Sequence, residues 1–199
     1  LPPVSVRVGG ETVQESRSVR NLGVTFDRHL TWDDHVNDVV RRCIGLLIGL
    51  RHLRHFLPRH VMRTVVDGLV LSRVRYCIAV YGNGTAKNDA KLLSIVNFAT
   101  RVITGLRKYD RVSLAREDLR LPSPQHMRDS SIISVARKAI ARGEPHDIAS
   151  QFVTYGDSRR ECDRRTRQDQ HYRPPRMRTA AGQRSFTYRA VSLLNASMQ

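Results

Sequence analysis

The chain has 199 residues, and its 34 lysines and arginines outnumber its 18 acidic residues to give a formal net charge of +16. This length can bury the core of one domain or of two small ones, and this charge favours a polyanionic partner, most simply nucleic acid. The sequence has no run of about eighteen apolar residues, which argues against a membrane partner. Its three cysteines, without a Cys-x-x-Cys pair, fit a reducing intracellular compartment, cytoplasmic or nuclear.

The first residues have the pattern of β-structure. Residues 4–8 and 11–14 flank Gly9-Gly10, and a Gly-Gly pair between alternating runs predicts a hairpin. Residues 19–26 predict another short strand, in which Gly23 marks a place where the backbone can approach a ligand closely. Because an isolated hairpin is marginally stable, we expect it to lean on a larger sheet outside this sequence, as in a fragment of a longer polypeptide.

Residues 31–58 predict a long amphipathic helix with a basic outer face. Thr31 is placed at its N-cap, Asp33 and Asp34 suit the helix dipole in the first turn, and Pro58 marks its end. The apolar stripe consists of Val36, Val39, Val40, Cys43, Ile44, Leu47, Leu50 and Leu53. Residues 40–65 contain no acid but several arginines and three histidines. This face is either an ordinary solvated surface or a surface for a polyanion.

Further helices follow the first one. Apolar periodicity predicts them at residues 60–81, 86–104, 110–119 and 125–142, with a last turn or two in 145–153. Gly105 and Gly143 are expected to end two of them, and Asp110 to cap another. Residues 157–178 hold eight arginines and few aliphatic residues, which fits a solvated loop or a nucleic-acid-binding arm equally well.

Short motifs occur along the chain in a set order. They are Asn21-Leu22-Gly23-Val24, Phe26-Asp27, Leu30-Thr31-Trp32, His35-Val36, Ser72-x-Val74-x-Tyr76, Val80-Tyr81-Gly82, Asn97-x-Ala99-x-Arg101-x-Ile103-x-Gly105, Leu121-Pro122, Gly143-Glu144-Pro145, and Gly182-Gln183-Arg184-Ser185-Phe186 before Leu194-Asn195. In this order they resemble the region that follows the catalytic motif in reverse transcriptases of LINE-type (non-LTR) retrotransposons. Many family members have Trp-Gly at Tyr81-Gly82 and a tryptophan at Leu194, and their closing Leu-Pro is absent here.

The predicted elements describe a mainly α chain with a small N-terminal β-hairpin and strand, and the resemblance implies a thumb-like helical bundle. It divides the chain into a palm edge with a primer-grip-like strand (1–29), a thumb-like bundle (30–108), further helices (109–156), a basic linker (157–181) and a short C-terminal element (182–199). The implied parent is an RNA-directed DNA polymerase that uses Mg²⁺. The implied partners are an RNA/DNA template-primer and the upstream palm and fingers of the same polyprotein, with no small-molecule ligand.

The candidate binding residues come from the resemblance and from charge. The resemblance places Leu22 and Gly23 where the primer grip touches the primer backbone. Our hypothesis for phosphate contacts adds basic residues of the acid-free face and of the later helix 86–104 and its end, namely Arg41, Arg42, Arg51, Arg54, Arg101, Arg107 and Lys108. Contacts of this kind depend on shape and charge, so they predict binding that is insensitive to sequence and steep in salt.

Polymerase chemistry needs closely placed aspartates that hold two magnesium ions. The one Asp-Asp pair, Asp33-Asp34, opens a helix rather than a strand turn, so we interpret it as helix-start acids. We expect the catalytic pair upstream of Leu1, and neither a catalytic residue nor a metal site in this chain; His52 and His55 lack the glutamate of His-Glu-x-x-His. Two alternatives stay open: a degenerate or domesticated nucleic-acid-binding module, and a helical domain that binds an acidic protein partner.

Overall fold

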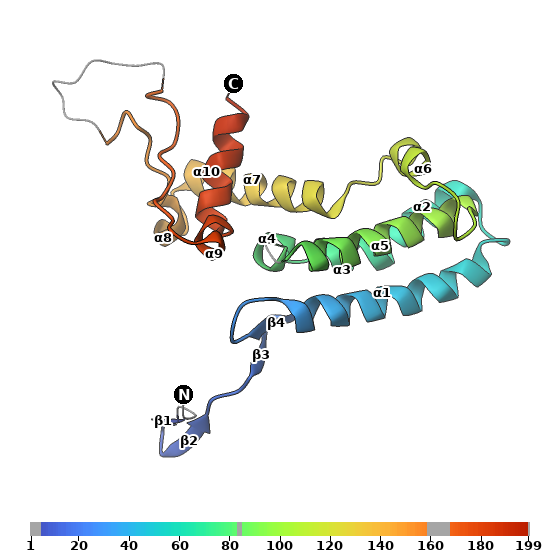
Figure 1. The fold of residues 1–199 in the computed structure, drawn as a ribbon, viewed down its shortest axis with the longest axis horizontal. Coiled ribbons are helices and arrows are strands. Elements are labelled where there is room, and N and C mark those ends of the chain that lie inside the picture. The colour runs from blue at the N-terminus through green and yellow to red at the C-terminus, as the bar shows by residue number, and fades with distance from the viewer. Residues whose placement is uncertain (1–4, 83–84, 159–167, 199) are drawn as a thin grey trace.

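The computed structural model describes residues 5–82, 85–158 and 168–198, and helices make up most of it (Figure 1). Two small antiparallel strand pairs precede the helices. The prediction of a mainly α chain with a small N-terminal β-hairpin is therefore confirmed. None of the described helices is long and apolar enough to cross a membrane.

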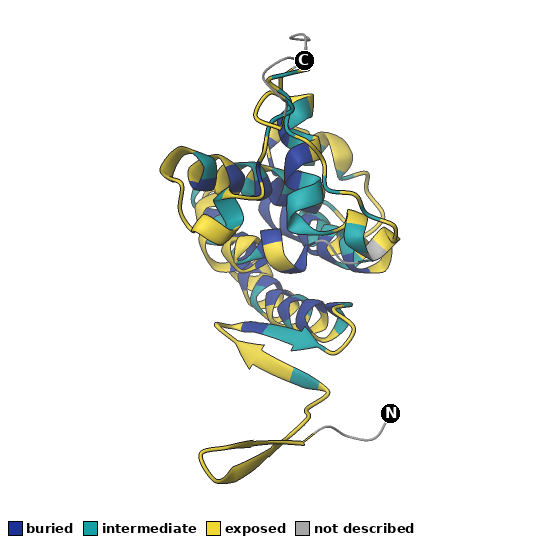
Figure 2. Cartoon of the chain, turned by 90° about the vertical axis from the view of Figure 1, so that its left-hand side faces the viewer, coloured by how far each residue is buried: buried dark blue, intermediate teal, exposed yellow. Residues whose placement is uncertain are grey.

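The first hairpin projects away from the helices. β1 (Ser5–Val8) pairs with β2 (Glu11–Gln14), and Gly9 and Gly10 make the turn with positive φ values, as the sequence predicts. Val4, which the same prediction included, lies outside the described residues. Both strands are exposed along their whole length, as Figure 2 shows in yellow. This hairpin adds no side chain to the core.

The predicted strand over residues 19–26 is wrong, because this stretch folds as a second hairpin. β3 (Ser18–Asn21) pairs with β4 (Val24–Asp27), and Leu22 and Gly23 form the turn between them. Their φ values are 46° and 85°, and two successive positive φ values match the right-handed twist of a two-residue hairpin. Val24 is 3% exposed and joins the hairpin to the core.

The segment before α1 (Asp33–Leu53) is organised by Asp27, not by Thr31. The predicted N-cap at Thr31 is wrong: Trp32 holds that position with φ 65°, and no side chain caps the helix. The Asp27 carboxylate accepts three backbone hydrogen bonds from this segment, at 3.0 Å from Thr31 and 2.7 Å from Trp32 among them. Burial acts to raise the pKa of Asp27, but these hydrogen bonds outweigh it and lower the pKa below its ordinary value.

One side of α1 packs into the core, and its first turn carries the predicted Asp33 and Asp34. The buried residues of the predicted stripe are Val36, Val39, Cys43, Leu47 and Leu50. Ile44 and Leu53 were expected there too, but they are 38% and 49% exposed. A helix advances 100° per residue, so positions at the margins of an eight-residue stripe rotate out of the contact.

The predicted single helix over residues 60–81 is broken into several pieces. α2 (Arg59–Val66), a π-helical turn, η1 (Asp67–Leu71), and α3 (Ser72–Arg75) follow one another directly. The chain then leaves helical geometry, and Cys77, with φ 54°, precedes α4 (Ile78–Tyr81). The single-helix prediction is wrong because apolar periodicity does not register one left-handed residue.

The next long helices have the predicted extents. α5 (Ala86–Thr104) ends at Gly105, which has φ 84°, and α7 (Pro124–Arg142) is followed by the short α8 (His146–Ala149). Between them α6 (Ser113–Asp118) is shorter than predicted.

The predicted cap of α6 at Asp110 is wrong. The Asp110 carboxylate accepts the backbone N–H of Arg107 at 2.7 Å and so closes the preceding turn, while Val112 stands at the N-cap position.

The helices α1 and α5 run in the same direction. Helices α2 to α4 lead the chain back from the end of α1 to the start of α5 (Figure 1). At the starts of α1 and α5, Asn88 donates to the carbonyl of Thr31 at 3.0 Å. At their ends, the Arg54 guanidinium lies against Gly105. Basic residues that are far apart in sequence therefore meet at one end of this pair.

The buried side chains form two clusters. The larger one joins β4, helices α1 to α5, the segment after α6 and the start of α7, around residues such as Leu47, Met62 and Ile95. The smaller one joins α7, α8 and α10 (Phe186–Ala196) with Ala79 of α4, around Ile132 and Val191. A short helix, α9 (Ala180–Gln183), precedes α10.

The predicted basic linker is only partly described, since residues 159–167 lie outside the described ranges. The part around Tyr172 is packed against α10. The side chain of Asn195 accepts the N–H of Tyr172 at 2.9 Å and donates to its carbonyl at 2.8 Å. The Tyr172 ring also lies edge-on to Phe152, with ring centres 6.0 Å apart. Asn195 of the closing motif therefore anchors this segment.

Candidate nucleic-acid interface

Five of the nine predicted binding residues line one pocket. It lies where α1 and α5 end and has a volume of about 510 Å³. Its basic residues are Arg51, Arg54, Arg101, Arg107 and Lys108. His55, Gly105 and the apolar side chains of Phe98, Val102 and Leu106 complete the lining, and no acid among the described residues takes part. We call this the α1–α5 basic pocket.

Gly105 allows the α1–α5 basic pocket to form. The Arg54 guanidinium occupies the space that a Cβ at residue 105 would fill, and the φ of 84° at this position suits glycine. Arg101 Nε donates to the carbonyl of Arg107 at 3.2 Å, which holds the following turn against α5. Gly105 and Arg101, two residues of one motif, thus arrange cations at the surface.

The partial negative charges at the ends of α1 and α5 do not balance the positive charge of this pocket. Each helix C-terminus carries about half a negative charge, so α1 and α5 together supply about one unit. Five cations surround these ends. Within the described ranges, none of the five forms an ion pair with a carboxylate. The pocket is therefore strongly positive and attracts anions.

Arg41 and Arg42 lie outside this pocket, about 15 Å earlier along α1 by helical rise. Both contact Asp38, each at an N···O distance of 2.9 Å. Their side chains are 81% and 45% exposed, so both retain donors that face solvent. Arg42 also lines a second, smaller pocket together with Gly23.

Leu22 and Gly23 form the tip of the β3–β4 hairpin. The Tyr76 hydroxyl donates to the carbonyl of Leu22 at 2.7 Å, and a Cβ at Gly23 would lie 3.4 Å from the Tyr76 ring. The close approach that the sequence predicted at Gly23 is thus made by Tyr76 in the structure. The Leu22 side chain, 84% exposed, is what the hairpin tip presents to solvent.

Sequence reasoning missed three residues beside this hairpin, Arg20, His35 and Arg73. They line the second pocket with Gly23 and Arg42. Arg20 belonged to a predicted strand and Arg73 to a predicted helix, and no spacing rule links positions 20, 35 and 73. Only the turn at Leu22-Gly23 brings them together.

His35 is buried as a neutral acceptor. It is 5% exposed, its Nδ1 accepts the N–H of Thr25 at 3.3 Å, and its ring lies edge-on to Tyr81 at 4.6 Å between centres. Burial lowers the pKa of His35 below 6.5; Asp38 opposes this effect, and Arg20 and Arg42 reinforce it. The folded chain therefore takes up a proton on this ring only at a lower pH than the unfolded chain does.

We expect stability to fall as the pH drops below about 6.5, because the unfolded state then binds the His35 proton first. This one group contributes at most about 1.4 kcal/mol per pH unit, and nothing further above the unfolded pKa. Urea unfolding between pH 7.5 and 5.5 measures the loss. The variant His35→Asn keeps an acceptor for Thr25 but does not titrate, so its pH dependence should be flatter. Equal slopes for both chains would contradict the assignment.

The Tyr81-Gly82 motif has a structural role. Tyr81 is 1% exposed, and its hydroxyl donates to the carbonyl of Val74. A Cβ at residue 82 would collide with the carbonyl of Ile78, so only glycine fits there. The carbonyl of Gly82 in turn accepts a hydrogen bond from Arg128.

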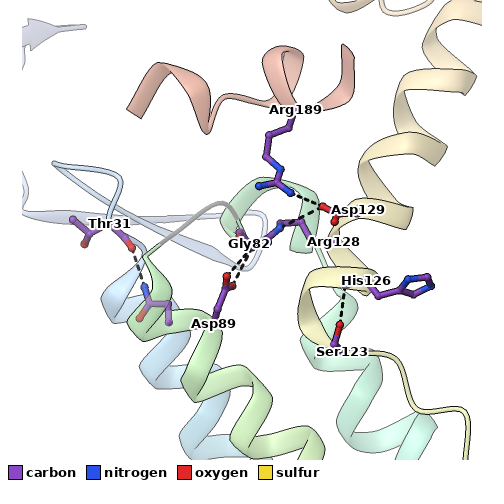
Figure 3. A network of polar contacts seen from close by, with 9 residues as sticks. Thr31, Gly82, Asp89, Ser123, His126, Arg128, Asp129 and Arg189 are labelled. Atoms are coloured by element: carbon purple, nitrogen blue, oxygen red, sulfur yellow. Dashed lines mark hydrogen bonds and ion pairs between the residues drawn. The ribbon is translucent and has the colours of Figure 1, made fainter. Parts of the chain in front are cut away.

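Arg128 of α7 is the centre of a buried polar network (Figure 3), and sequence reasoning did not single it out. It is 5% exposed, and its Nη1 lies 3.0 and 3.3 Å from the two carboxylate oxygens of Asp89. Its Nε lies 3.8 Å from Asp129, which also binds Arg189 of α10 at 2.7 Å. The network thus connects α4, α5, α7 and α10, far from the basic pocket.

The Asp33-Asp34 pair is not part of a metal-ligand cluster among the described residues. These residues contain no group of three or more histidine, cysteine or acidic side chains that could hold a metal ion. Asp33 lies 3.9 Å from Lys87, and Asp34 is exposed at the start of α1. The two carboxylates stand in the first turn, where they interact favourably with the helix dipole.

The chain is similar to a probable RNA-directed DNA polymerase from transposon BS of Drosophila melanogaster. The two are 27% identical over 126 residues, which are 61% of this chain and 14% of that protein, so the chain spans only a small part of its relative. No family model and no solved structure matches the chain. The similarity supports a reverse transcriptase-related region, which is the class of protein that the motifs resemble.

Proposed function

We propose that the chain is the post-catalytic region of a LINE-type retrotransposon reverse transcriptase and that it binds template-primer nucleic acid. Similarity to a transposon polymerase supports the class of protein. The observation that carries the binding role is the convergence of five cations, without an acid, at the α1–α5 basic pocket. Magnesium and the catalytic aspartates would belong to the upstream palm of the same polyprotein.

The arrangement along α1 suits a duplex. The 21 residues of α1 extend over about 31 Å. A strand of nucleic acid offers one phosphate per roughly 3.4 Å, so this length spans about nine phosphates. The hairpin tip lies at one end, Arg41 and Arg42 lie midway, and the basic pocket lies at the other end. Arginine suits this task because its planar fork binds two phosphate oxygens at once.

The whole chain should bind an RNA–DNA hybrid with an affinity that falls roughly 10²- to 10³-fold between about 50 and 200 mM salt. Hybrids of unrelated sequence should bind equally well, because phosphate contacts carry no sequence information. Fluorescence anisotropy of a labelled hybrid measures both properties. A salt-independent affinity would contradict the phosphate model. Equal competition by poly-glutamate would instead favour an acidic protein partner.

A further inference from the structure

The second pocket, which Gly23 and Arg42 line, is small and separate from the basic pocket. It lies between the β3–β4 hairpin and helices α1 and α3, and its residues on α1 precede Arg51 of the basic pocket by 9 to 16 positions, or roughly 14 to 24 Å of helical rise. Its volume is about 220 Å³, below the ~300–1,000 Å³ of clefts that take drug-sized ligands. A pocket of this size suits a single small group.

Three arginines line this pocket, and only one of them is neutralised. Arg42 binds Asp38 at 2.9 Å, and the other oxygen of Asp38 binds Arg41, so the one acid in the lining is fully engaged. In the described part of the chain, neither Arg20 nor Arg73 contacts a carboxylate. The Nε of Arg73 donates to the carbonyl of Leu69 at 3.2 Å, which orients the guanidinium and leaves its terminal nitrogens for a ligand.

His35 adds a donor that has no acceptor. Because its Nδ1 accepts the N–H of Thr25, the proton of the neutral ring is on Nε2. The ring is 5% exposed and lines the pocket, yet no described residue accepts a hydrogen bond from Nε2. Nε2 keeps access to solvent, so its N–H is available to donate to an oxyanion in the pocket. The lowered pKa keeps this ring a neutral donor at pH 7.

We propose that this pocket is a phosphate-binding site, in which Arg20 and Arg73 supply the charge and the Nε2–H of His35 donates an oriented hydrogen bond. The ligand is a phosphate oxyanion, either from a nucleic-acid backbone or free in solution. The site rests on its own contacts rather than on the α1–α5 basic pocket. If the proposed function holds, it gives the hairpin side of the duplex surface a defined phosphate contact.

NMR of the whole chain with ¹⁵N-labelled histidine tests this site at pH 7.5, with inorganic phosphate as the probe. The His35 ring resonances should shift saturably. Arg73→Gln and Arg20→Gln should each weaken the response at least about tenfold, since each removes a charge-assisted hydrogen bond. Arg137→Gln removes an exposed charge of α7 and should leave the response unchanged. A linear, unsaturable shift in the native chain, or an equal loss in all three variants, would overturn the proposal.

A second titration, with a short RNA–DNA hybrid, separates the two sources of phosphate. If the hybrid reproduces the His35 shift, the pocket holds a backbone phosphate. If only inorganic phosphate shifts the ring, the pocket is a site for free phosphate. A variant with glutamine at Arg51, Arg54, Arg101 and Arg107 should keep the response to inorganic phosphate even where it no longer binds the hybrid. Failure of the duplex model and failure of the phosphate site are therefore distinguishable.

Discussion

Replacing Arg51, Arg54, Arg101 and Arg107 together by glutamine should lower the affinity for an RNA–DNA hybrid roughly 10²- to 10³-fold at about 100 mM salt. The reason is that each arginine removed leaves one phosphate neutralised by counterions instead of by protein. The slope of log affinity against log salt should flatten by about one unit per arginine, or three to four units in total. Anisotropy titrations at several salt concentrations measure both quantities.

The matched control removes the same charge from the opposite end of the bundle. Arg137, Lys138, Arg142 and Arg184 are exposed, and the first three lie on α7, away from the basic pocket (Figure 1). Their replacement by glutamine lowers the net charge equally but should leave the salt slope nearly unchanged. Equal losses in the two variants would mean that net charge, and not the pocket, determines binding. Circular dichroism confirms that both variants fold.

The helices were predicted from the sequence better than the turns and breaks between them. Residues 86–104 combine a sustained apolar face with Gly105 behind the last turn, so the extent of the helix and its C-terminal end follow from local sequence. The break at Cys77 has no such signal, because a φ of 54° is uncommon for a residue other than glycine and the local sequence does not mark it. The same holds for Leu22, whose left-handed conformation turned a predicted strand into a hairpin.

Predicting the site had a similar limit. Charge and position on predicted helices selected Arg51, Arg54 and Arg101 from the sequence. Their meeting in one pocket was not predicted, because it depends on how α1 and α5 pack. Arg20, His35 and Arg73 come from three elements whose meeting depends on the hairpin, which local patterns did not reveal. Arg128 was missed because its burial follows from tertiary packing, whereas an arginine in a helix is ordinarily expected on the surface.

Arg128→Met should destabilise the chain by about 3 kcal/mol, the largest effect that we expect from a single polar substitution. The loss leaves the buried carbonyl of Gly82 without its donor and removes the cation that Asp89 and Asp129 share. Methionine keeps the unbranched aliphatic stem, so the measured cost reports the charge and hydrogen bonds rather than a cavity. Urea unfolding at pH 7 gives the free energy.

Two controls separate burial from charge pairing. Arg59→Met breaks an exposed pair with Asp118 at 2.8 Å and should cost less than about 1 kcal/mol, because water screens both charges. Arg189→Met removes the outer partner of Asp129 and should give an intermediate cost, since Arg128 still faces that carboxylate. The ranking follows how far each guanidinium is withdrawn from solvent, with side chains 6%, 28% and 55% exposed for Arg128, Arg189 and Arg59. If Arg128→Met lowered the free energy of unfolding no more than Arg59→Met, the network would not be what holds α7 and α10 to the rest of the bundle.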